Sequence, residues 1–281
     1  MKNIFHLPLV LLIFVSCTPP SDTLNEEHRP IQVELTTSMG AITLELSDKT
    51  PLHRDNFVNL VNDGMYDSII FHRVLQGFVV QAGEFDSLRQ ANLDSSVLES
   101  LDYRVPAEFD TTLFHKRGAL GAARDGNPER ASSSIQFYIV QAGPQPDSMI
   151  VKGEKRINGW LQQHYATLAP ENKMWLDSLN FALENDDYEL FGTIYDTLSK
   201  IAKDFEDYEP YRIPEYQKEI YRTTGGTPHL DQNYTVFGEV VAGMNVIDSI
   251  AAVPVGDGGR PIDQVMILNA KVIKTKREMP E

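Results

Sequence analysis

Residues 71–83 read Phe-His-Arg-Val-Leu-Gln-Gly-Phe-Val-Val-Gln-Ala-Gly, the most informative stretch of the chain. Its apolar residues lie on either side of Gln76-Gly77, a pattern that predicts two short strands joined by a turn. The strands carry one guanidinium, Arg73, and one side-chain amide, Gln81. Arginine is charged at every relevant pH and offers five N–H donors. The two strands are therefore a candidate site for holding a polar group.

The chain on both sides of this stretch is also patterned mainly as strands. Alternating apolar residues predict a hairpin over 31–46 and further strands over 118–123, 135–141, 235–240 and 265–274. Only two segments outside the centre of the chain, 50–64 and 244–250, have helical spacing. Many short strands with two clear helices are typical of a closed antiparallel barrel. The sequence therefore predicts a mainly β fold.

Residues 144–222 break the strand pattern and are predicted to be helical. Apolar residues recur there at helical spacing, namely Leu190, Ile194, Leu198, Ile201 and Phe205. Because the strands resume after residue 222, we interpret the segment as a helical insertion within a loop of the barrel. The apolar stripe is interpreted as the core of the insertion rather than as a groove for a partner.

The first residues are typical of an export signal. Lys2 precedes an apolar run, residues 4–15, that is too short to span a bilayer as a mature helix. The single cysteine of the chain, Cys17, follows this run in a setting that resembles a bacterial lipobox. These features predict a lipoprotein signal peptide over 1–16, a lipid on Cys17, and a polar tether over 17–30.

The lipid anchor predicts a place for the protein in the bacterial cell envelope. Thr18 after the cysteine does not resemble the aspartate that retains lipoproteins at an inner membrane, so we expect the outer membrane. The alternative is an ordinary signal peptide with a coincidental cysteine.

Charge and composition exclude several classes of function. The chain has 25 Lys and Arg against 40 Asp and Glu, for a formal net charge of −15. Such a charge repels phosphate, so we expect no nucleic-acid partner. One cysteine excludes an internal disulfide, and the seven histidines include no His-Glu-x-x-His motif. We therefore predict neither a metal site nor a redox site.

Residues 71–83 resemble the signature of the cyclophilin-type peptidyl-prolyl isomerases, because aromatic-His-Arg, Gly-Phe, Gln and Gly all fall in register. Residues 135–139 and 236–240 look like two further strands of that family. The resemblance covers residues 31–143 and 223–275. It implies an eight-stranded antiparallel barrel capped by two helices, in a domain over 31–275 that contains the insertion and precedes a tail over 276–281.

The resemblance also implies a site without a cofactor. Arg73 would be the catalytic residue. Gln81 would hold a substrate carbonyl, and the backbone of Ala123 would meet the extended substrate. The remaining predicted binding residues would form an apolar pocket for the proline ring and its rim: Phe78, Val79, Tyr138, Leu230 and, on the rim, His229.

Some positions depart from the family pattern. His229 stands where a tryptophan or phenylalanine often lies, Tyr234 where a histidine often lies, and Arg124 where eukaryotic members have asparagine. These departures imply an altered substrate preference.

Two functions of different class follow. The first is a peptidyl-prolyl cis–trans isomerase that assists the folding of exported proteins, with proline-containing polypeptides as substrates. The alternative is a chaperone that binds proline segments without catalysis and uses the insertion to recruit clients or partners. The sequence leaves the oligomeric state open.

Overall fold

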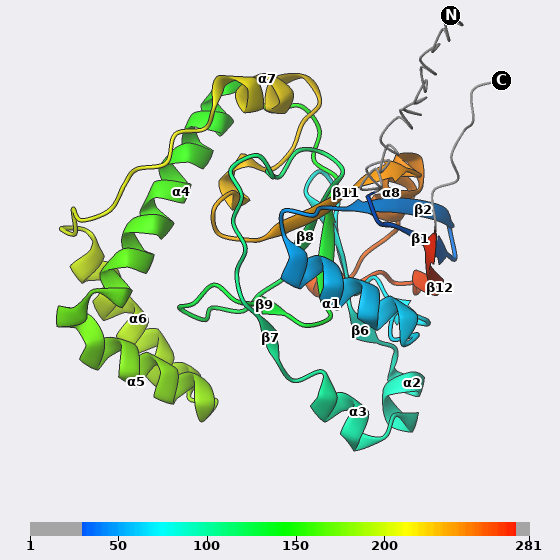
Figure 1. The fold of residues 1–281 in the computed structure, drawn as a ribbon, viewed down its shortest axis with the longest axis horizontal. Helices are drawn as coiled ribbons and strands as arrows, with labels where there is room; N and C mark the ends of the chain where they lie inside the picture. The colour runs from blue at the N-terminus through cyan, green and yellow to red at the C-terminus, as the bar shows by residue number, and fades with distance from the viewer. Residues whose placement is uncertain (1–29, 274–281) are drawn as a thin grey trace, which may run out of the picture.

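The computed structural model describes residues 30–273, and its main feature there is one curled sheet of ten strands (Figure 1). The strands are β1 (Gln32–Thr37), β2 (Gly40–Leu46), β3 (Ile69–Ile70), β4 (Arg73–Leu75), β5 (Val79–Ala82), β6 (Glu84–Phe85), β8 (Ala119–Ala122), β10 (Phe137–Val140), β11 (Val236–Ala242) and β12 (Met266–Ile273). Their hydrogen-bonded order is β4-β5-β10-β8-β11-β2-β1-β12-β3-β6, and every pairing is antiparallel. A separate pair joins β7 (Arg104–Val105) to β9 (Ser132–Ser133).

The predicted hairpin over 31–46 is confirmed as β1 and β2. Alternate side chains of both strands are buried, as the period of two requires: Val33, Leu35, Ile42, Leu44 and Leu46. The hairpin closes where Thr37 pairs with Gly40, whose φ of +133° few residues other than glycine adopt. One face of the hairpin therefore belongs to the core.

The expected closed barrel of eight strands is wrong in strand count and in closure. The sheet has ten strands, and its order has two ends, β4 and β6. Both ends come from the stretch 69–85, where β3 pairs with β6 and β4 pairs with β5. The pairing breaks at Phe71-His72 on one side and at Gly83, with a φ of +118°, on the other. These two breaks divide each arm of the stretch into two short strands.

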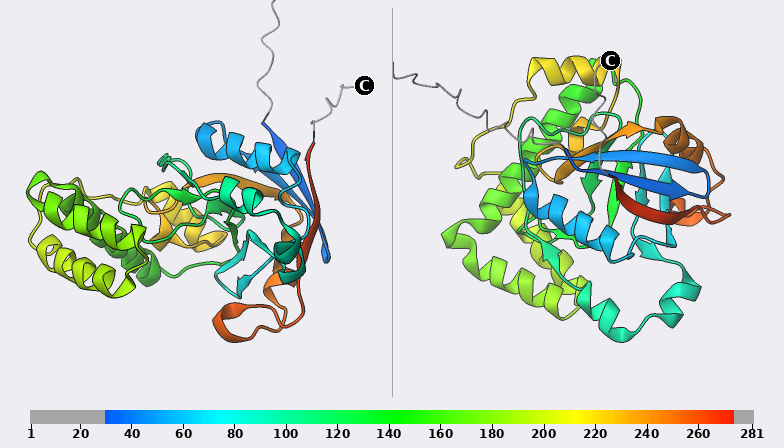
Figure 2. Two further views of the ribbon diagram at one scale, coloured as in Figure 1. Left: turned by 90° about the horizontal axis from the view of Figure 1, so that it is seen from below. Right: turned by 45° about the vertical axis from the view of Figure 1, so that its right-hand side comes forward.

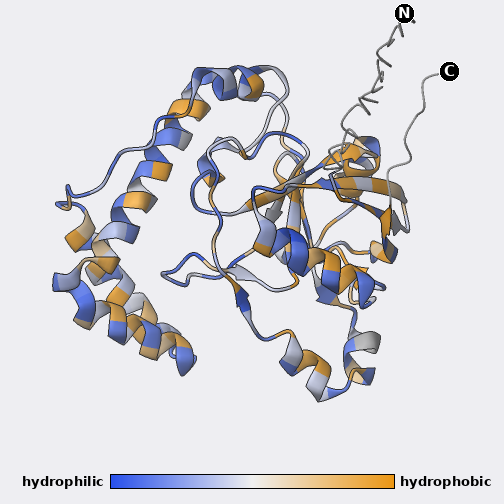
Figure 3. Ribbon diagram, viewed as in Figure 1, coloured by the Kyte–Doolittle hydropathy of each residue, from blue (hydrophilic) through white to orange (hydrophobic). Residues whose placement is uncertain are grey.

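Two helices cover the core of the sheet, as predicted. Helix α1 (Pro51–Asn62) buries Phe57, Leu60 and Val61, and helix α8 (Met244–Ala251) buries Val246, Ile247 and Ile250. All six side chains belong to one apolar cluster with the inner faces of β1, β2 and β12. Hydrophobic colouring gathers on these elements in Figure 3.

Four α-helices lie between β10 and β11: α4 (Asp147–Leu168), α5 (Lys173–Glu184), α6 (Tyr188–Ala202) and α7 (Glu215–Thr223). Figure 2 shows α4–α6 as a lobe beside the sheet. Leu179, Ile194 and Leu198 form a small core of this lobe, in agreement with the predicted stripe. A second cluster joins Ile150 and Ile157 of α4 to Phe114 near the sheet.

Residues 89–102, a polar stretch for which the sequence predicts a surface loop, are partly helical. They contain most of α2 (Ser87–Asn92) and the whole of α3 (Ser95–Ser100). The Asp94 side chain accepts a hydrogen bond from the Ser96 backbone N–H at 2.9 Å and caps α3. Both helices are about one and a half turns long, too short for apolar periodicity to reveal them.

Several predictions fall outside the described residues. The signal peptide over 1–16, Cys17 with its lipid, nearly all of the tether and the tail over 276–281 are among them. Within residues 30–273, none of the helices combines the length and the apolar character needed to cross a bilayer.

Candidate active site

All eight residues predicted for the proline site line one cavity of about 370 Å³. They come from separate parts of the sheet and from the short helix η2 (Pro228–Leu230): Arg73 on β4; Phe78, Val79 and Gln81 on or beside β5; Ala123 after β8; Tyr138 on β10; His229 and Leu230 on η2. The sheet therefore brings together residues that are up to 157 positions apart, from Arg73 to Leu230.

Arg73 and Gln81 form the polar side of the cavity. They are paired partners across β4 and β5, so their side chains share one face of the sheet. The Arg73 Nη1 donates to Gln81 Oε1 at 3.3 Å, and Gln81 Nε2 donates to Gln136 Oε1 at 3.1 Å. Both side chains are half-buried. The chain of amides orients the guanidinium while leaving most of its N–H groups available to a ligand.

Four buried side chains form the apolar floor: Val79, Ala123, Tyr138 and Leu230. Tyr138 lies against Gly121 on the neighbouring strand, where a Cβ atom at 121 would stand 2.4 Å from the Tyr138 ring. No side chain fits between them, so the glycine allows the ring to lie flat along β8. The floor is apolar enough for a pyrrolidine ring to bury its CH₂ groups there.

A buried hydrogen-bond network fixes the Tyr138 ring from below. The Tyr138 hydroxyl lies 2.7 Å from His115 Nε2, and His115 Nδ1 lies 2.8 Å from the Asp231 carboxylate. Tyr221 of α7 donates its hydroxyl to the other Asp231 oxygen at 2.6 Å. Because a carboxylate only accepts, His115 donates from Nδ1, and with the proton on Nδ1 its Nε2 accepts a hydrogen bond from the Tyr138 hydroxyl. Burial raises the pKa of Tyr138 well above its usual value, so the hydroxyl remains a neutral donor.

His229 forms the rim of the cavity. Its ring stacks on Phe78 with centroids 5.5 Å apart and planes 11° from parallel. Burial, with a smaller effect from the Arg156 charge, lowers the pKa of His229 to about 4. The imidazole is therefore neutral at neutral pH and acts as a flat aromatic surface.

The sequence did not single out every residue of this site. Arg156 and Trp160, on α4, line the same cavity, although their segment was interpreted as a separate insertion. His115 and Asp231 were missed as well, because they meet only in the folded chain, 116 positions apart. Nothing in the local sequence around His115 could have revealed this pairing.

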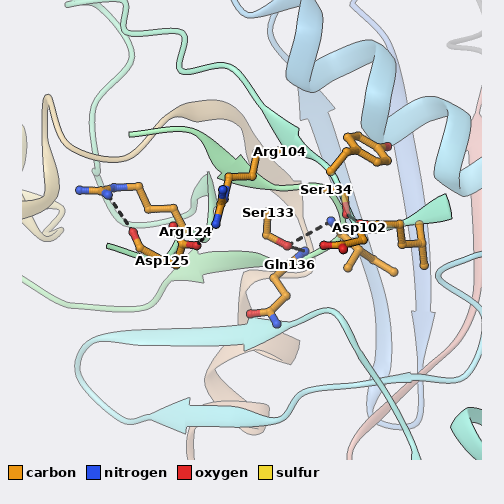
Figure 4. Close-up of a pocket in the computed structure, with 10 residues that line it drawn as sticks. Asp102, Arg104, Arg124, Asp125, Ser133, Ser134 and Gln136 are labelled. Atoms are coloured by element: carbon orange, nitrogen blue, oxygen red, sulfur yellow. Dashed lines mark hydrogen bonds and ion pairs between the residues drawn. The ribbon is translucent and has the colours of Figure 1, made fainter. Parts of the chain in front are cut away.

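A second cavity of about 580 Å³ lies beside the first, and Figure 4 draws the residues that line it. Gln136 and Arg124 connect the two, since Gln136 bonds to Gln81 and Arg124 lines both cavities. Arg104 and Asp125 form an ion pair at its wall at 2.6 Å.

Comparison with known proteins identifies the family to which this chain belongs. The family model described as cyclophilin-type peptidyl-prolyl cis–trans isomerase matches residues 32–222 and 215–272. The chain belongs to this family, and the expected enzyme class is confirmed.

Bacterial relatives agree with this class. A protein of Staphylococcus saprophyticus that bears the name of a peptidyl-prolyl cis–trans isomerase is 26% identical over 247 residues, which cover 87% of this chain and 92% of that one. A Streptococcus pyogenes protein named as a bifunctional phosphatase and peptidyl-prolyl cis–trans isomerase is 28% identical over 250 residues. The match covers 88% of this chain but only 40% of that longer protein.

A solved structure shares the fold. The crystal structure of a cyclophilin-type peptidyl-prolyl cis–trans isomerase of Cryptosporidium parvum superposes with a TM-score of 0.50 at 17% sequence identity. The superposition covers 88% of this chain and all of that one.

Proposed function

We propose that this protein catalyses cis–trans isomerisation of X-Pro bonds in exported polypeptides, with Arg73 as its catalytic residue. The observation that carries the proposal is the Arg73 guanidinium, held by Gln81, at the edge of a cavity whose apolar floor includes Tyr138. Membership of the isomerase family supports the reaction class.

The reaction needs no covalent step. Partial double-bond character gives the amide a rotational barrier of about 18–20 kcal/mol. The proline ring binds on the apolar floor, and Gln81 and the Ala123 backbone hold the chain beside it. As the bond twists, the prolyl nitrogen regains its lone pair, and the Arg73 guanidinium donates a hydrogen bond to it. This bond exists only in the twisted state, so it lowers the barrier selectively.

The test is cis–trans exchange of an Ala-Pro peptide, measured by NMR exchange spectroscopy with the wild type and Arg73→Ala. We expect kcat/KM to fall by about 10²-fold, the typical effect of removing one positioned donor. Arg212→Ala is the matched control, because Arg212 is exposed, does not line the cavity and pairs with Glu154. Equal rates for wild type and Arg73→Ala would refute the assignment.

The second part of the proposal concerns the cellular location of the protein. A lipid on Cys17 would hold the folded part at the outer membrane, where exported chains fold. The variant Cys17→Ser should move the protein from the membrane fraction to the soluble or unprocessed fraction. Unchanged membrane attachment of this variant would contradict the lipid anchor.

The non-catalytic alternative has one observation in its favour. The outer face of α5 exposes Met174 and Phe181, with 65% and 58% of their surfaces accessible. Deleting residues 144–222 would not isolate this role, because it also removes Arg156 and Trp160 from the cavity. Phe181→Glu is the cleaner change. A client-binding role predicts lost protection of an unfolded client with peptide exchange retained, whereas unchanged protection would remove its support.

A further inference from the structure

The proline cavity carries three guanidinium groups and is lined by no carboxylate of the described chain. Arg73 and Arg124 come from the sheet side, and Arg156 comes from α4. Among residues 30–273, none of the three forms an ion pair with an acidic side chain. This lining is unusual in a chain with a formal net charge of −15. Local positive charge that forms no ion pair within the described residues favours a ligand that brings the negative charge itself.

Helix α4 is seated against the site by direct packing. Gly153 lies against η2, and a Cβ atom there would stand 3.1 Å from the backbone nitrogen of His229 and 3.3 Å from Pro228. Residues three and seven positions further along a helix share its face. Arg156 and Trp160 therefore follow Gly153 on the face that is turned to η2 and the cavity.

Aromatic contacts hold the two flanking arginines in place. The Arg156 guanidinium lies over the Trp160 ring at 4.6 Å, and Trp160 meets the edge of Tyr234 at 6.4 Å. The Arg124 guanidinium lies over the same Tyr234 ring at 5.2 Å. The four side chains form a row, Arg156–Trp160–Tyr234–Arg124, along one side of the cavity.

The two guanidinium groups of this row, those of Arg124 and Arg156, differ in how many of their N–H donors are already used. Arg124 already donates to the backbone oxygens of Asp125, Asn127 and Asn233 and to the Asn233 side chain. Arg156 is exposed, and within residues 30–273 its guanidinium contacts the Trp160 ring without a hydrogen bond or an ion pair of its own. Arg156 is thus the cation that retains free donors for a carboxylate. Its charge reaches the rim, since it contributes to lowering the pKa of His229.

We propose that the cavity selects prolyl segments with an acidic side chain next to the proline, and that Arg156 is the residue that determines this specificity. The inference rests on the proposed function, because it concerns the substrate of the same site. The occupant is an acidic peptide segment, with the proline on the Tyr138 floor and the carboxylate at Arg156.

The experiment compares peptides that differ only in Glu and its uncharged isostere Gln, placed either directly before or directly after the Ala-Pro unit. Exchange is measured by NMR at low salt, and affinity is measured by titration. We expect a roughly two- to five-fold preference in kcat/KM for Glu in at least one placement, the usual effect of one exposed ion pair. The preference should shrink in 0.5 M NaCl because salt screens it.

Variants assign the effect to one side chain. Arg156→Gln should bring the rates for the Glu and Gln peptides together, whereas Arg156→Lys should retain a preference for Glu. Arg212→Gln is the matched control and should behave as the wild type, because Arg212 lies away from the cavity and pairs with Glu154.

The outcomes separate the inference from the proposed function. Exchange with equal rates and equal affinities for Glu and Gln peptides would overturn the inference and leave the isomerase intact. Tighter binding of the Glu peptide without any exchange would overturn the isomerase and support the recognition. A Glu preference that survives in Arg156→Gln would overturn the role of Arg156.

Discussion

Gly121 shows how one residue shapes the whole cavity, because its missing side chain leaves room for the Tyr138 ring. We expect Gly121→Ala to lower the free energy of unfolding by about 1–3 kcal/mol, the usual cost of overpacking a core. Tyr138 cannot move aside without breaking its hydrogen bond to His115. Chemical denaturation measures the change in stability, and peptide exchange measures the accompanying loss of activity.

Gly143 provides the control for this substitution. A Cβ atom at Gly143 would meet nothing within 4 Å, and its φ is not positive. Gly143→Ala should therefore leave both measurements near wild-type values. A Gly121→Ala variant as stable and active as Gly143→Ala would contradict the packing argument.

Single residues of the site were predictable where a local motif carries them. Arg73, Phe78, Val79 and Gln81 lie within 71–83, and the pairing of β4 with β5 in the structure places Arg73 and Gln81 on one face. The role of His115 was not predictable, because it depends on a carboxylate 116 positions away. Motifs record local constraints, whereas buried hydrogen-bond networks are created by the fold.

At the scale of elements, α7 is tied to the proline site through one buried hydroxyl. Tyr221 donates to Asp231, which in turn accepts from the His115 backbone N–H and side chain. Tyr221→Phe leaves one oxygen of a buried carboxylate without that donor. We expect a loss of about 1–3 kcal/mol in the free energy of unfolding, measured by chemical denaturation.

A tyrosine-to-phenylalanine substitution at an exposed position is the control for Tyr221→Phe. Tyr165 of α4 is exposed, and Tyr165→Phe should change stability by less than about 0.5 kcal/mol. If the two variants proved equally stable, Tyr221 would not contribute to the network as described.

Helices and strands were easier to predict when they were long and when their apolar residues recurred with a clear period. The hairpin of β1 and β2 and the helices α1 and α8 follow from clear periodicity. The closed barrel of eight strands was wrong because the apolar pattern over 69–85 does not show the breaks at His72 and Gly83. Breaks of this kind depend on tertiary packing.

At the scale of the whole molecule, buried and half-buried histidines make the stability depend on pH. Burial is the main cause that lowers the pKa of four of them: His53, His72, His164 and His229. For His164 the folded value is about 4 against an ordinary 6.5. Between these values the unfolded chain binds a proton that the folded chain does not bind. The contribution of His164 to the free energy of unfolding is therefore fully present above pH 6.5 and is lost as the pH falls toward 4.

A single variant isolates the contribution of His164. His164→Gln lacks the titrating group, so its melting temperature should fall less steeply than that of the wild type between pH 6.5 and 4. The comparison uses the slope, because the variant also loses the hydrogen bond from Nδ1 to the Pro128 oxygen. Parallel curves would contradict the assignment.

The placement of the α4–α7 segment was the least predictable feature at this scale. Its helices and their small core follow from the 3.6-residue spacing. The docking of α4 on the proline site depends on Gly153 meeting η2, a contact between residues 75 and 76 positions apart in the chain. Amphipathic spacing tells which face of a helix is buried, but it does not tell against which element.

The first and last strands of the sheet are neighbours, with Gln32 paired to Ile273 (Figure 1). Paired Cα atoms of antiparallel strands are about 5 Å apart. A short linker could therefore join these two positions, and new ends could be opened between α2 and α3, where the side chains are mostly exposed. Such a circular permutant would preserve every strand pairing of the sheet, and its new ends would lie between α2 and α3.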